Sequence, residues 1–203
     1  MISPDIGGKG KDVMTDFDAM IADHLACIRD LRGRREVVTA AAAALVGVVR
    51  RGGRIFVCGN GGSAADAQHF AAELVGRFEQ ERRALPAVAL TTDTSILTAV
   101  ANDYGYDAVF ARQLAGLAAP GDALIGLSTS GNSENVRQAL RLAADRNVLR
   151  VVLTGGDGGF LKAEADHAIV APAANTARVQ EAHILVLHYL AGAIESALKE
   201  TDS

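Results

Sequence analysis

The chain has 203 residues, of which 49% are hydrophobic and 22% charged, with a formal net charge of −4. This composition is typical of one globular domain with a core, and the small acidic excess argues against nucleic acid as the main ligand. No apolar run is long enough to span a bilayer, and the N-terminus lacks the apolar core of a signal peptide, so we expect a cytoplasmic protein without a membrane partner.

Two long helical patterns come first. We interpret residues 1–12, rich in Gly, Lys and Asp, as a flexible tail and residues 13–203 as a single domain that includes these helices. From about residue 14 to residue 50, apolar residues recur at spacings of three and four, which predicts a helical arm that Gly33 interrupts. Cys27, in this arm, and Cys58 are the only cysteines, and we expect both to be buried free thiols.

From about residue 54 onward, short apolar runs alternate with helical patterns. The predicted strands are 54–58, 86–90, 122–127, 149–153 and 168–170. The predicted helices are 64–78, 93–101, 107–117, 134–144 and 178–198. Such alternation predicts an α/β fold, a doubly wound parallel five-stranded sheet sandwiched by helices, with an N-terminal helical arm.

Three polar, Gly-rich loops fall at the predicted carboxyl ends of strands, where such sheets bind ligands: 59–63, 128–133 and 154–159. The first, Gly59-Asn60-Gly61-Gly62-Ser63, lets the backbone approach a ligand closely and offers a helix N-terminus to an anion. It lacks the residues of a dinucleotide or nucleotide fingerprint. An ordinary capped turn is the alternative.

The second loop, residues 128–133, combines four hydroxyl side chains, one amide and backbone N–H groups without a positive side chain. Such a nest suits a phosphate monoester that must bind and leave reversibly, although a Ser/Thr-rich turn with one cap would have the same composition. Two phosphate-competent loops in one sheet favour a phosphorylated ligand.

His69 and Glu73 are one helical turn apart and share a face, so they can chelate a metal, form an acid–base pair, or be a solvated surface pair. The last helix carries Gln180, His183 and His188 among apolar residues. The pattern alone does not choose between the two histidines, and Gln180 and His188 are about 12 Å apart along a helix axis. One metal can bind both only if long side chains lean together, the helix starts late, or subunits share the site.

Asn102 and Asp103 follow a predicted helix, where they suit either a turn or contacts to sugar hydroxyls.

Taken together, five segments resemble the phosphoheptose isomerases of the sugar-isomerase (SIS) domain family. They are Cys58 to Glu73, Ala101 to Gly105, Ser128 to Ser133, Leu153 to Gly155 and Val179 to His183. The likeness runs from about residue 17 to residue 198. It implies a SIS fold, tetramers with active sites near subunit interfaces, and conversion of sedoheptulose 7-phosphate to glycero-manno-heptose 7-phosphate, the first step of bacterial ADP- or GDP-heptose biosynthesis.

By position, the resemblance also implies residue roles. One Zn²⁺ per subunit would be held by His69, Glu73, Gln180 and His188. Glu73 and His188 would be base and acid, and the phosphate cradle would be Ser128, Thr129, Ser130 and Ser133. The sugar contacts would be Asn60, Gly61, Gly62, Ser63, Glu73, Asn102, Asp103 and Gln180. Ala177 stands where some members have an acidic residue, so we assign no acid–base role there.

Two other hypotheses use the same fold without catalysis. One is an adaptor that binds the bacterial replication initiator, and the other is a sugar-phosphate sensor. The adaptor branch lacks the acid–base Glu and His, and since this chain has both Glu73 and His188, its sequence favours the enzyme.

Overall fold

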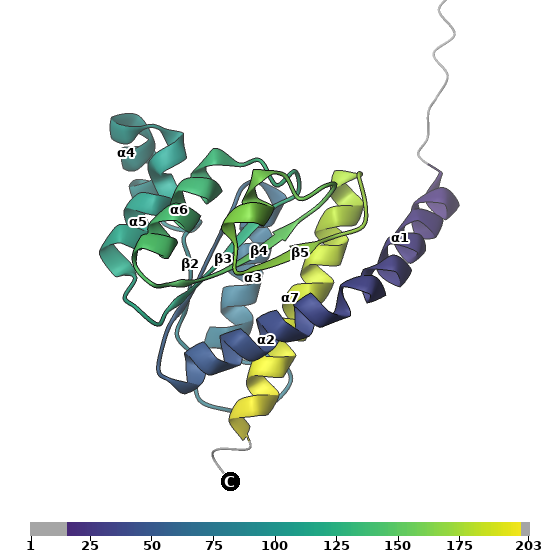
Figure 1. The fold of residues 1–203 in the computed structure, drawn as a ribbon, viewed down its shortest axis with the longest axis horizontal. Coiled ribbons are helices and arrows are strands. Elements are labelled where there is room, and N and C mark those ends of the chain that lie inside the picture. The colour runs from purple at the N-terminus through teal and green to yellow at the C-terminus, as the bar shows by residue number, and fades with distance from the viewer. Residues whose placement is uncertain (1–15, 200–203) are drawn as a thin grey trace, which may run out of the picture.

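The central sheet consists of five parallel strands, as predicted (Figure 1). Their order in the sheet is β2-β1-β3-β4-β5. The strands are β1 (Ile55–Gly59), β2 (Ala87–Ala89), β3 (Ala123–Ser128), β4 (Leu149–Thr154) and β5 (His167–Val170). This computed structural model describes residues 16–199, so the tail predicted at 1–12 lies outside the described residues.

Helices cover both faces of the sheet. On one face lie α2 (Arg35–Arg50), α3 (Gly62–Val75) and α7 (Thr176–Lys199); on the other lie α4 (Thr94–Tyr104), α5 (Val109–Leu117) and α6 (Glu134–Asp145) (Figure 1). Successive strand side chains point to opposite faces. In β1, Ile55 and Val57 therefore join the core under α2, α3 and α7, while Phe56 and Cys58 join the core on the other face.

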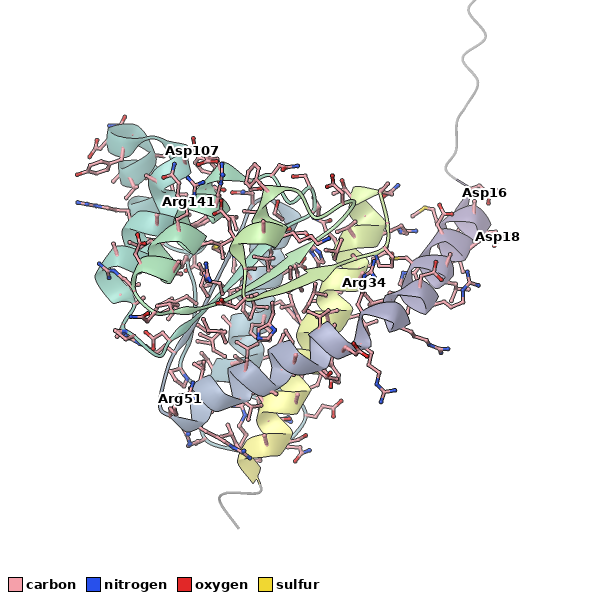
Figure 2. The ribbon with its side chains drawn as sticks, viewed as in Figure 1. Asp16, Asp18, Arg34, Arg51, Asp107 and Arg141 are labelled. Atoms are coloured by element: carbon pink, nitrogen blue, oxygen red, sulfur yellow. The ribbon has the colours of Figure 1, made fainter. Side chains whose placement is uncertain are left out.

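The N-terminal arm is α1 (Phe17–Leu31), joined to α2 by the short 3₁₀ helix η1 (Arg32–Arg34), which confirms the predicted interruption at Gly33. Asp16 caps α1 by accepting hydrogen bonds from two backbone N–H groups, and the Arg34 guanidinium donates to the carbonyl of Val170 in β5 (Figure 2). Beyond this tether, α1 continues past the edge of the sheet (Figure 1).

Two predicted helices have C-terminal ends that are wrong by three residues. The helix predicted at 64–78 begins at Gly62 and ends at Val75, because the backbone N–H of Phe78 donates to the Glu195 carboxylate instead of continuing the helix. The helix predicted to end at residue 101 runs to Tyr104, where Gly105 leaves helical geometry with φ +87°. Asn102 and Asp103 therefore lie on a helix and not in a loop.

Cys27 and Cys58 are buried free thiols, as predicted. Burial raises the pKa of the Cys58 thiol to about 12, so it stays protonated and has no nucleophilic character at neutral pH. Among the helices that the structure describes, none has the length and apolar character needed to cross a bilayer. The cytoplasmic location stays a prediction.

Candidate active site

A cavity of about 320 Å³ lies at the carboxyl ends of β1 and β3. In a sheet of this order the direction in which successive strands are added reverses between β1 and β3, and doubly wound folds bind ligands at this position. The cavity is lined by Asn60, Gly61, Gly62, Ser63, Leu127, Ser128, Thr129, Ser130, Ser133, Thr176 and Gln180. The structure therefore brings together the first two predicted loops and Gln180.

This cavity suits an anion although no lining residue is charged. Three helices begin at it: α3 at Gly62, α6 directly after Ser133, and α7 at Thr176. The first turn of each helix has N–H groups without partners inside the helix and carries the positive end of the helix dipole. Three such ends around one neutral cavity favour a phosphate group that binds reversibly.

The loop 128–133 is stabilised by contacts within it and by close packing against the loop 154–159. Ser128 Oγ and Ser133 Oγ lie 2.9 Å apart, and the backbone N–H of Asn132 donates to Ser130 Oγ over 3.2 Å. Gly131 has φ +69°, and a Cβ at this position would collide with the carbonyl of Gly158. Glycine is therefore required at position 131 both for the backbone angle and for this close packing.

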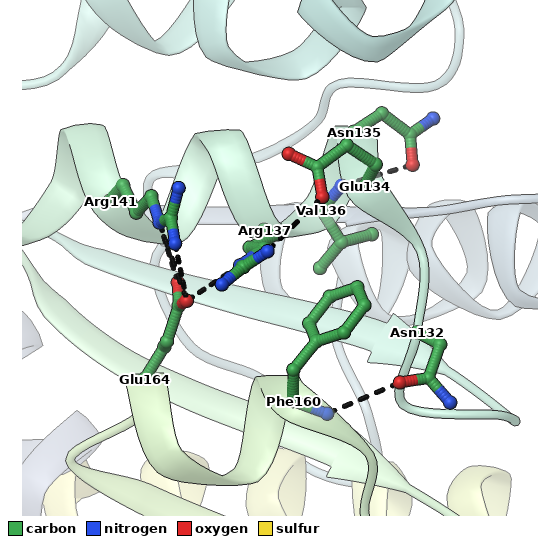
Figure 3. Close-up of polar contacts among 8 residues, drawn as sticks. All are labelled: Asn132, Glu134, Asn135, Val136, Arg137, Arg141, Phe160 and Glu164. Carbon is green, nitrogen blue, oxygen red and sulfur yellow. Dashed lines mark hydrogen bonds and ion pairs between the residues drawn. The ribbon is translucent and has the colours of Figure 1, made fainter.

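The loop is braced from outside by the 3₁₀ helix η3 (Phe160–Glu164). Asn132 Oδ1 accepts from the N–H of Phe160, whose ring lies 4.5 Å from the Arg137 guanidinium carbon (Figure 3). Glu164 pairs with Arg137 and Arg141 of α6; burial would raise its pKa, but the two guanidinium groups lower it below its ordinary value. The third predicted loop, 154–159, thus connects β4 to η3, which supports the loop 128–133 of the cavity.

Asn60 is held by two residues that sequence reasoning did not single out. Its amide exchanges two hydrogen bonds with the buried amide of Asn135, at 2.9 and 2.8 Å, and its Oδ1 accepts from Tyr106 Oη at 3.1 Å. Asn135 lies two residues after the Ser-rich segment, in the first turn of the helix predicted at 134–144, and its amide at that place is a usable signal. Tyr106 lies outside any strong pattern, so its contact could not be found from sequence.

Beside the cavity, α3 and α7 bring His69, Glu73 and His188 together (Figure 1 locates the helices). The Nε2 atom of His69 lies 2.9 Å from Nε2 of His188 and 3.2 Å from Oε1 of Glu73. His69 is exposed, while Glu73 and His188 are half-buried. Three convergent N and O donors within 4.8 Å of one another fit a divalent cation, and they also fit an acid–base pair.

The structure separates the two histidines of α7. His183 is buried, and its Nε2 lies 3.0 Å from the carbonyl of Thr154, which makes it a packing residue at the end of β4. Burial lowers the pKa of His183 to about 4, so its imidazole is neutral at physiological pH. His188 is the histidine that joins His69 and Glu73.

Gln180 belongs to the cavity. Its amide packs so closely on Gly62 that a Cβ there would overlap it. Eight residues, about 12 Å along α7, separate Gln180 from His188. Three of the four predicted metal ligands are therefore together, and the fourth lies with the sugar-binding loop.

Asn102 and Asp103 are exposed on the last turn of α4, and Asn102 Nδ2 donates a hydrogen bond to Asp103 Oδ1 at 2.8 Å. Within the described range 16–199, neither lines the cavity.

Comparison with known proteins identifies the domain family of the chain. The model of the SIS domain family matches residues 21–155. This match defines the chain as a SIS-domain protein.

The chain is 54% identical to a phosphoheptose isomerase of Geobacter metallireducens over 188 residues. The aligned residues cover 93% of this chain and 98% of that protein. Solved phosphoheptose isomerases from Neisseria gonorrhoeae and Francisella tularensis match with TM-scores of 0.84 and 0.83. They are 44% and 38% identical, covering 88% and 90% of this chain and 96% and 100% of theirs. The chain belongs to the phosphoheptose isomerase family and is an isomerase.

Proposed function

We propose that this isomerase converts sedoheptulose 7-phosphate to glycero-manno-heptose 7-phosphate, the first step of bacterial ADP- or GDP-heptose biosynthesis. The observation that supports it best is a neutral cavity at the N-termini of α3, α6 and α7, together with a His–Glu–His cluster on two of these helices, α3 and α7. Such an arrangement accommodates a phosphate group and a carbonyl group whose neighbouring carbon gives up a proton.

In this proposal the phosphate binds to Ser128, Thr129, Ser130 and Ser133, together with the N–H groups at the start of α6. This contact lies away from the reacting carbons, so its binding energy serves to fix the position of C1 and C2. The sugar chain contacts Asn60, Gly61, Gly62, Ser63 and Gln180, which line the same cavity. Asn102 and Asp103 are proposed as further sugar contacts.

Proton transfer is assigned to the cluster. Isomerisation moves a proton between C2 and C1 through an enediol, and Glu73 is the carboxylate that takes and returns it. His188 moves the proton at the neighbouring oxygen. A ring nitrogen of His188 lies within 4.8 Å of a carboxylate oxygen of Glu73, so in this proposal the acid His188 and the base Glu73 act on the substrate from the same side.

We propose His69, Glu73, Gln180 and His188 as ligands of one Zn²⁺ per subunit. Bound there, the cation would polarise the substrate carbonyl and stabilise the developing negative charge. The chemistry of the donors fits, since two imidazole nitrogens and a carboxylate oxygen converge. Because Gln180 lies against Gly62, the full set requires side chains that lean together or a ligand from a neighbouring subunit.

A homotetramer is the assembly we propose. On α1, Phe17 and Leu25 are 70% and 62% exposed. A second apolar surface is a groove of about 400 Å³ between α7 and the junction of α1 with α2, lined by residues that include Leu31, Val38 and Leu185. Exposed apolar surface of this kind is normally covered by another chain.

The test is isomerisation of sedoheptulose 7-phosphate by the purified protein, with and without a chelator, followed by identification of the product. Turnover to the aldoheptose 7-phosphate supports the proposal. Binding without turnover would favour the sensor hypothesis, and neither binding nor turnover would favour the adaptor. The convergence of Glu73 and His188 in one cluster argues against both alternatives.

A further inference from the structure

Phe78 lies on the face of the His188 imidazole. The two ring centroids are 5.5 Å apart with an angle of 27° between the planes, while the edge of His188 meets His69 at 62°. Phe78 also packs over Gly192, one turn further along α7, where a Cβ would lie 3.4 Å from the phenyl ring. The orientation of the imidazole is therefore bounded by Phe78 on its face and by His69 at its edge.

Phe78 belongs to the segment between α3 and β2, and Glu195 fixes that segment. The carboxylate of Glu195 accepts hydrogen bonds from the backbone N–H groups of Phe78, Glu79 and Gln80, at 3.0, 2.9 and 2.9 Å. Glu195 is 2% exposed and follows His188 by seven residues, two helical turns, so both side chains lie on the same face of α7.

Arg82 connects Glu195 to the end of α3. Its Nε lies 3.3 Å from Glu195 Oε1, and its Nη1 donates to the carbonyls of Leu74 and Gly76 at 2.8 and 2.9 Å. Its Nη2 donates to the carbonyl of Glu73 at 2.6 Å. Those carbonyls belong to the C-terminal end of α3, where no further helical turn is present to satisfy them.

Burial of a carboxylate lowers the stability of the folded protein unless its oxygens accept hydrogen bonds or pair with a cation. Burial would raise the pKa of Glu195, but the three N–H donors and Arg82 lower it below its ordinary value, so this carboxylate is ionised and held at neutral pH. The fixed charge at the junction of α3 and α7 leaves the connecting segment little freedom. The aromatic ring of this connecting segment, that of Phe78, stacks on His188.

We propose that Phe78, Arg82 and Glu195 form a positioning unit that sets the mutual geometry of Glu73 and His188. The inference rests on the proposed catalytic roles of that pair. Arg82 holds the backbone of Glu73, Glu195 holds the backbone of Phe78, and the Phe78 ring holds the imidazole of His188. None of the three lines the cavity among the residues that the structure describes, so they act on proton transfer and not on phosphate binding.

The test compares Phe78→Leu with Phe78→Tyr. Leucine keeps apolar contact but removes the stacked face, so we expect kcat to fall about tenfold to a hundredfold while KM stays within about twofold, because the cavity is untouched. Tyrosine keeps the face and should restore kcat to near the wild-type value. Phe160→Leu is the matched control: it loosens the brace of the loop 128–133 and should raise KM with a smaller effect on kcat.

A spectroscopic readout accompanies the kinetics. The Phe78 ring current should displace the His188 Hε1 proton resonance, which is identified among the five histidines by its absence in His188→Asn. Phe78→Leu should move that resonance and Phe78→Tyr should return it. Thermal melting of each variant identifies a loss of kcat that follows only from unfolding, which would count against the inference.

His188→Asn separates the two possible failures. If His188→Asn is inactive while Phe78→Leu keeps wild-type kcat and an unmoved resonance, the positioning unit is rejected and the proposed function stands. If His188→Asn itself turns over normally, the proposed catalytic role of His188 is rejected and the positioning inference with it. A rise in KM alone for Phe78→Leu would also overturn the inference, since it would assign Phe78 to substrate binding.

Discussion

Gln180 and His188 lie on the same helix but contact opposite halves of the site: Gln180 packs on Gly62 at the start of α3, and His188 Nε2 lies 2.9 Å from His69 Nε2 further along α3. The two helices therefore run side by side in the same direction. The N-terminal end of the contact between α3 and α7 borders the anion cavity, and the acid–base cluster lies further along the same contact. Binding and chemistry are thus positioned by one helix pair, although they come from distant parts of the sequence.

The first prediction concerns the base. Glu73→Gln keeps the shape of the side chain and removes its charge, so kcat should fall by about a thousandfold or more, while binding of sedoheptulose 7-phosphate survives. Steady-state kinetics and calorimetric titration measure the two quantities. Glu79→Gln, an exposed residue nearby, is the control and should behave as wild type. Near-normal turnover in Glu73→Gln would remove Glu73 from the mechanism.

The second prediction concerns the phosphate. Ser130→Ala combined with Ser133→Ala removes two hydroxyls that line the cavity, and we expect KM to rise about tenfold to a hundredfold. The effect on kcat should be smaller, because these contacts serve the ground state and the transition state alike. Sedoheptulose without phosphate should be a poor substrate for the wild type. Equal use of the two sugars would contradict the proposed phosphate site.

Much of this architecture follows from local sequence patterns. Alternating apolar runs predicted the five parallel strands, and the position of the loops 59–63 and 128–133 at strand ends predicted the cavity. The choice of His188 over His183 could not be made from the pattern, because both lie on an apolar helix and only packing against β4 buries His183.

Contacts between distant segments were beyond sequence reasoning. Asn135 and Tyr106 hold Asn60, and Phe78 stacks on His188, but none of the three follows a spacing that predicts the contact. The end of α3 was missed for a similar reason. Its helical pattern continues to residue 78, and the Glu195 carboxylate, over 100 residues away in the chain, takes the N–H groups that would have continued it.

The third prediction concerns stability and pH. Burial lowers the pKa of His183 from 6.5 to about 4 in the folded protein. Between these values the unfolded chain binds more protons, so the free energy of unfolding should fall as the pH drops from 6.5 to 4. This histidine contributes about 3 kcal/mol to that fall, which is complete below about pH 4. Above pH 6.5 the histidine is neutral in both states and no longer changes the free energy of unfolding with pH.

Urea unfolding at several pH values, compared with His183→Gln, measures the contribution. Glutamine keeps a donor for the Thr154 carbonyl and does not titrate, so the variant should lose less stability than wild type on acidification. Subtracting the two curves removes the acid sensitivity of Glu195 and Glu164, whose lowered pKa values act on both proteins. Parallel curves for the two proteins would mean that His183 is not the group responsible.

The fourth prediction concerns assembly. Light scattering at micromolar concentration should give a mass of about 84 kDa, four times 21.1 kDa. Leu25→Asp places a charge on the exposed apolar side of α1 and should shift the mass toward smaller species. Asp30→Ala, also exposed on α1, is the control and should leave the mass unchanged. A single monomeric species of the wild type would refute the homotetramer.

The fifth prediction concerns the metal, because the geometry of the cluster supports two protonation schemes. Without a cation, the His69 Nε2–H can donate to His188 Nε2 at 2.9 Å and to Glu73 Oε1 at 3.2 Å, and the three groups form a hydrogen-bonded acid–base set. With a cation, all three atoms present lone pairs, and no proton lies between the imidazoles. The two schemes differ in whether His69 is needed as a ligand or only as a hydrogen-bond donor.

Metal analysis followed by chelation and add-back separates these schemes. If the proposed site is correct, the purified protein contains about one zinc per chain, exhaustive chelation abolishes activity, and Zn²⁺ restores it. His69→Ala should then lose both metal and activity. His24→Ala, which removes a histidine of α1 that pairs with Glu181 of α7, should keep its metal. Gln180→Ala distinguishes a ligand from a sugar contact: a ligand variant loses metal affinity, whereas a sugar-contact variant keeps its metal and raises KM. Full activity after exhaustive metal removal would reject the zinc and leave Glu73 and His188 as a metal-free acid–base pair.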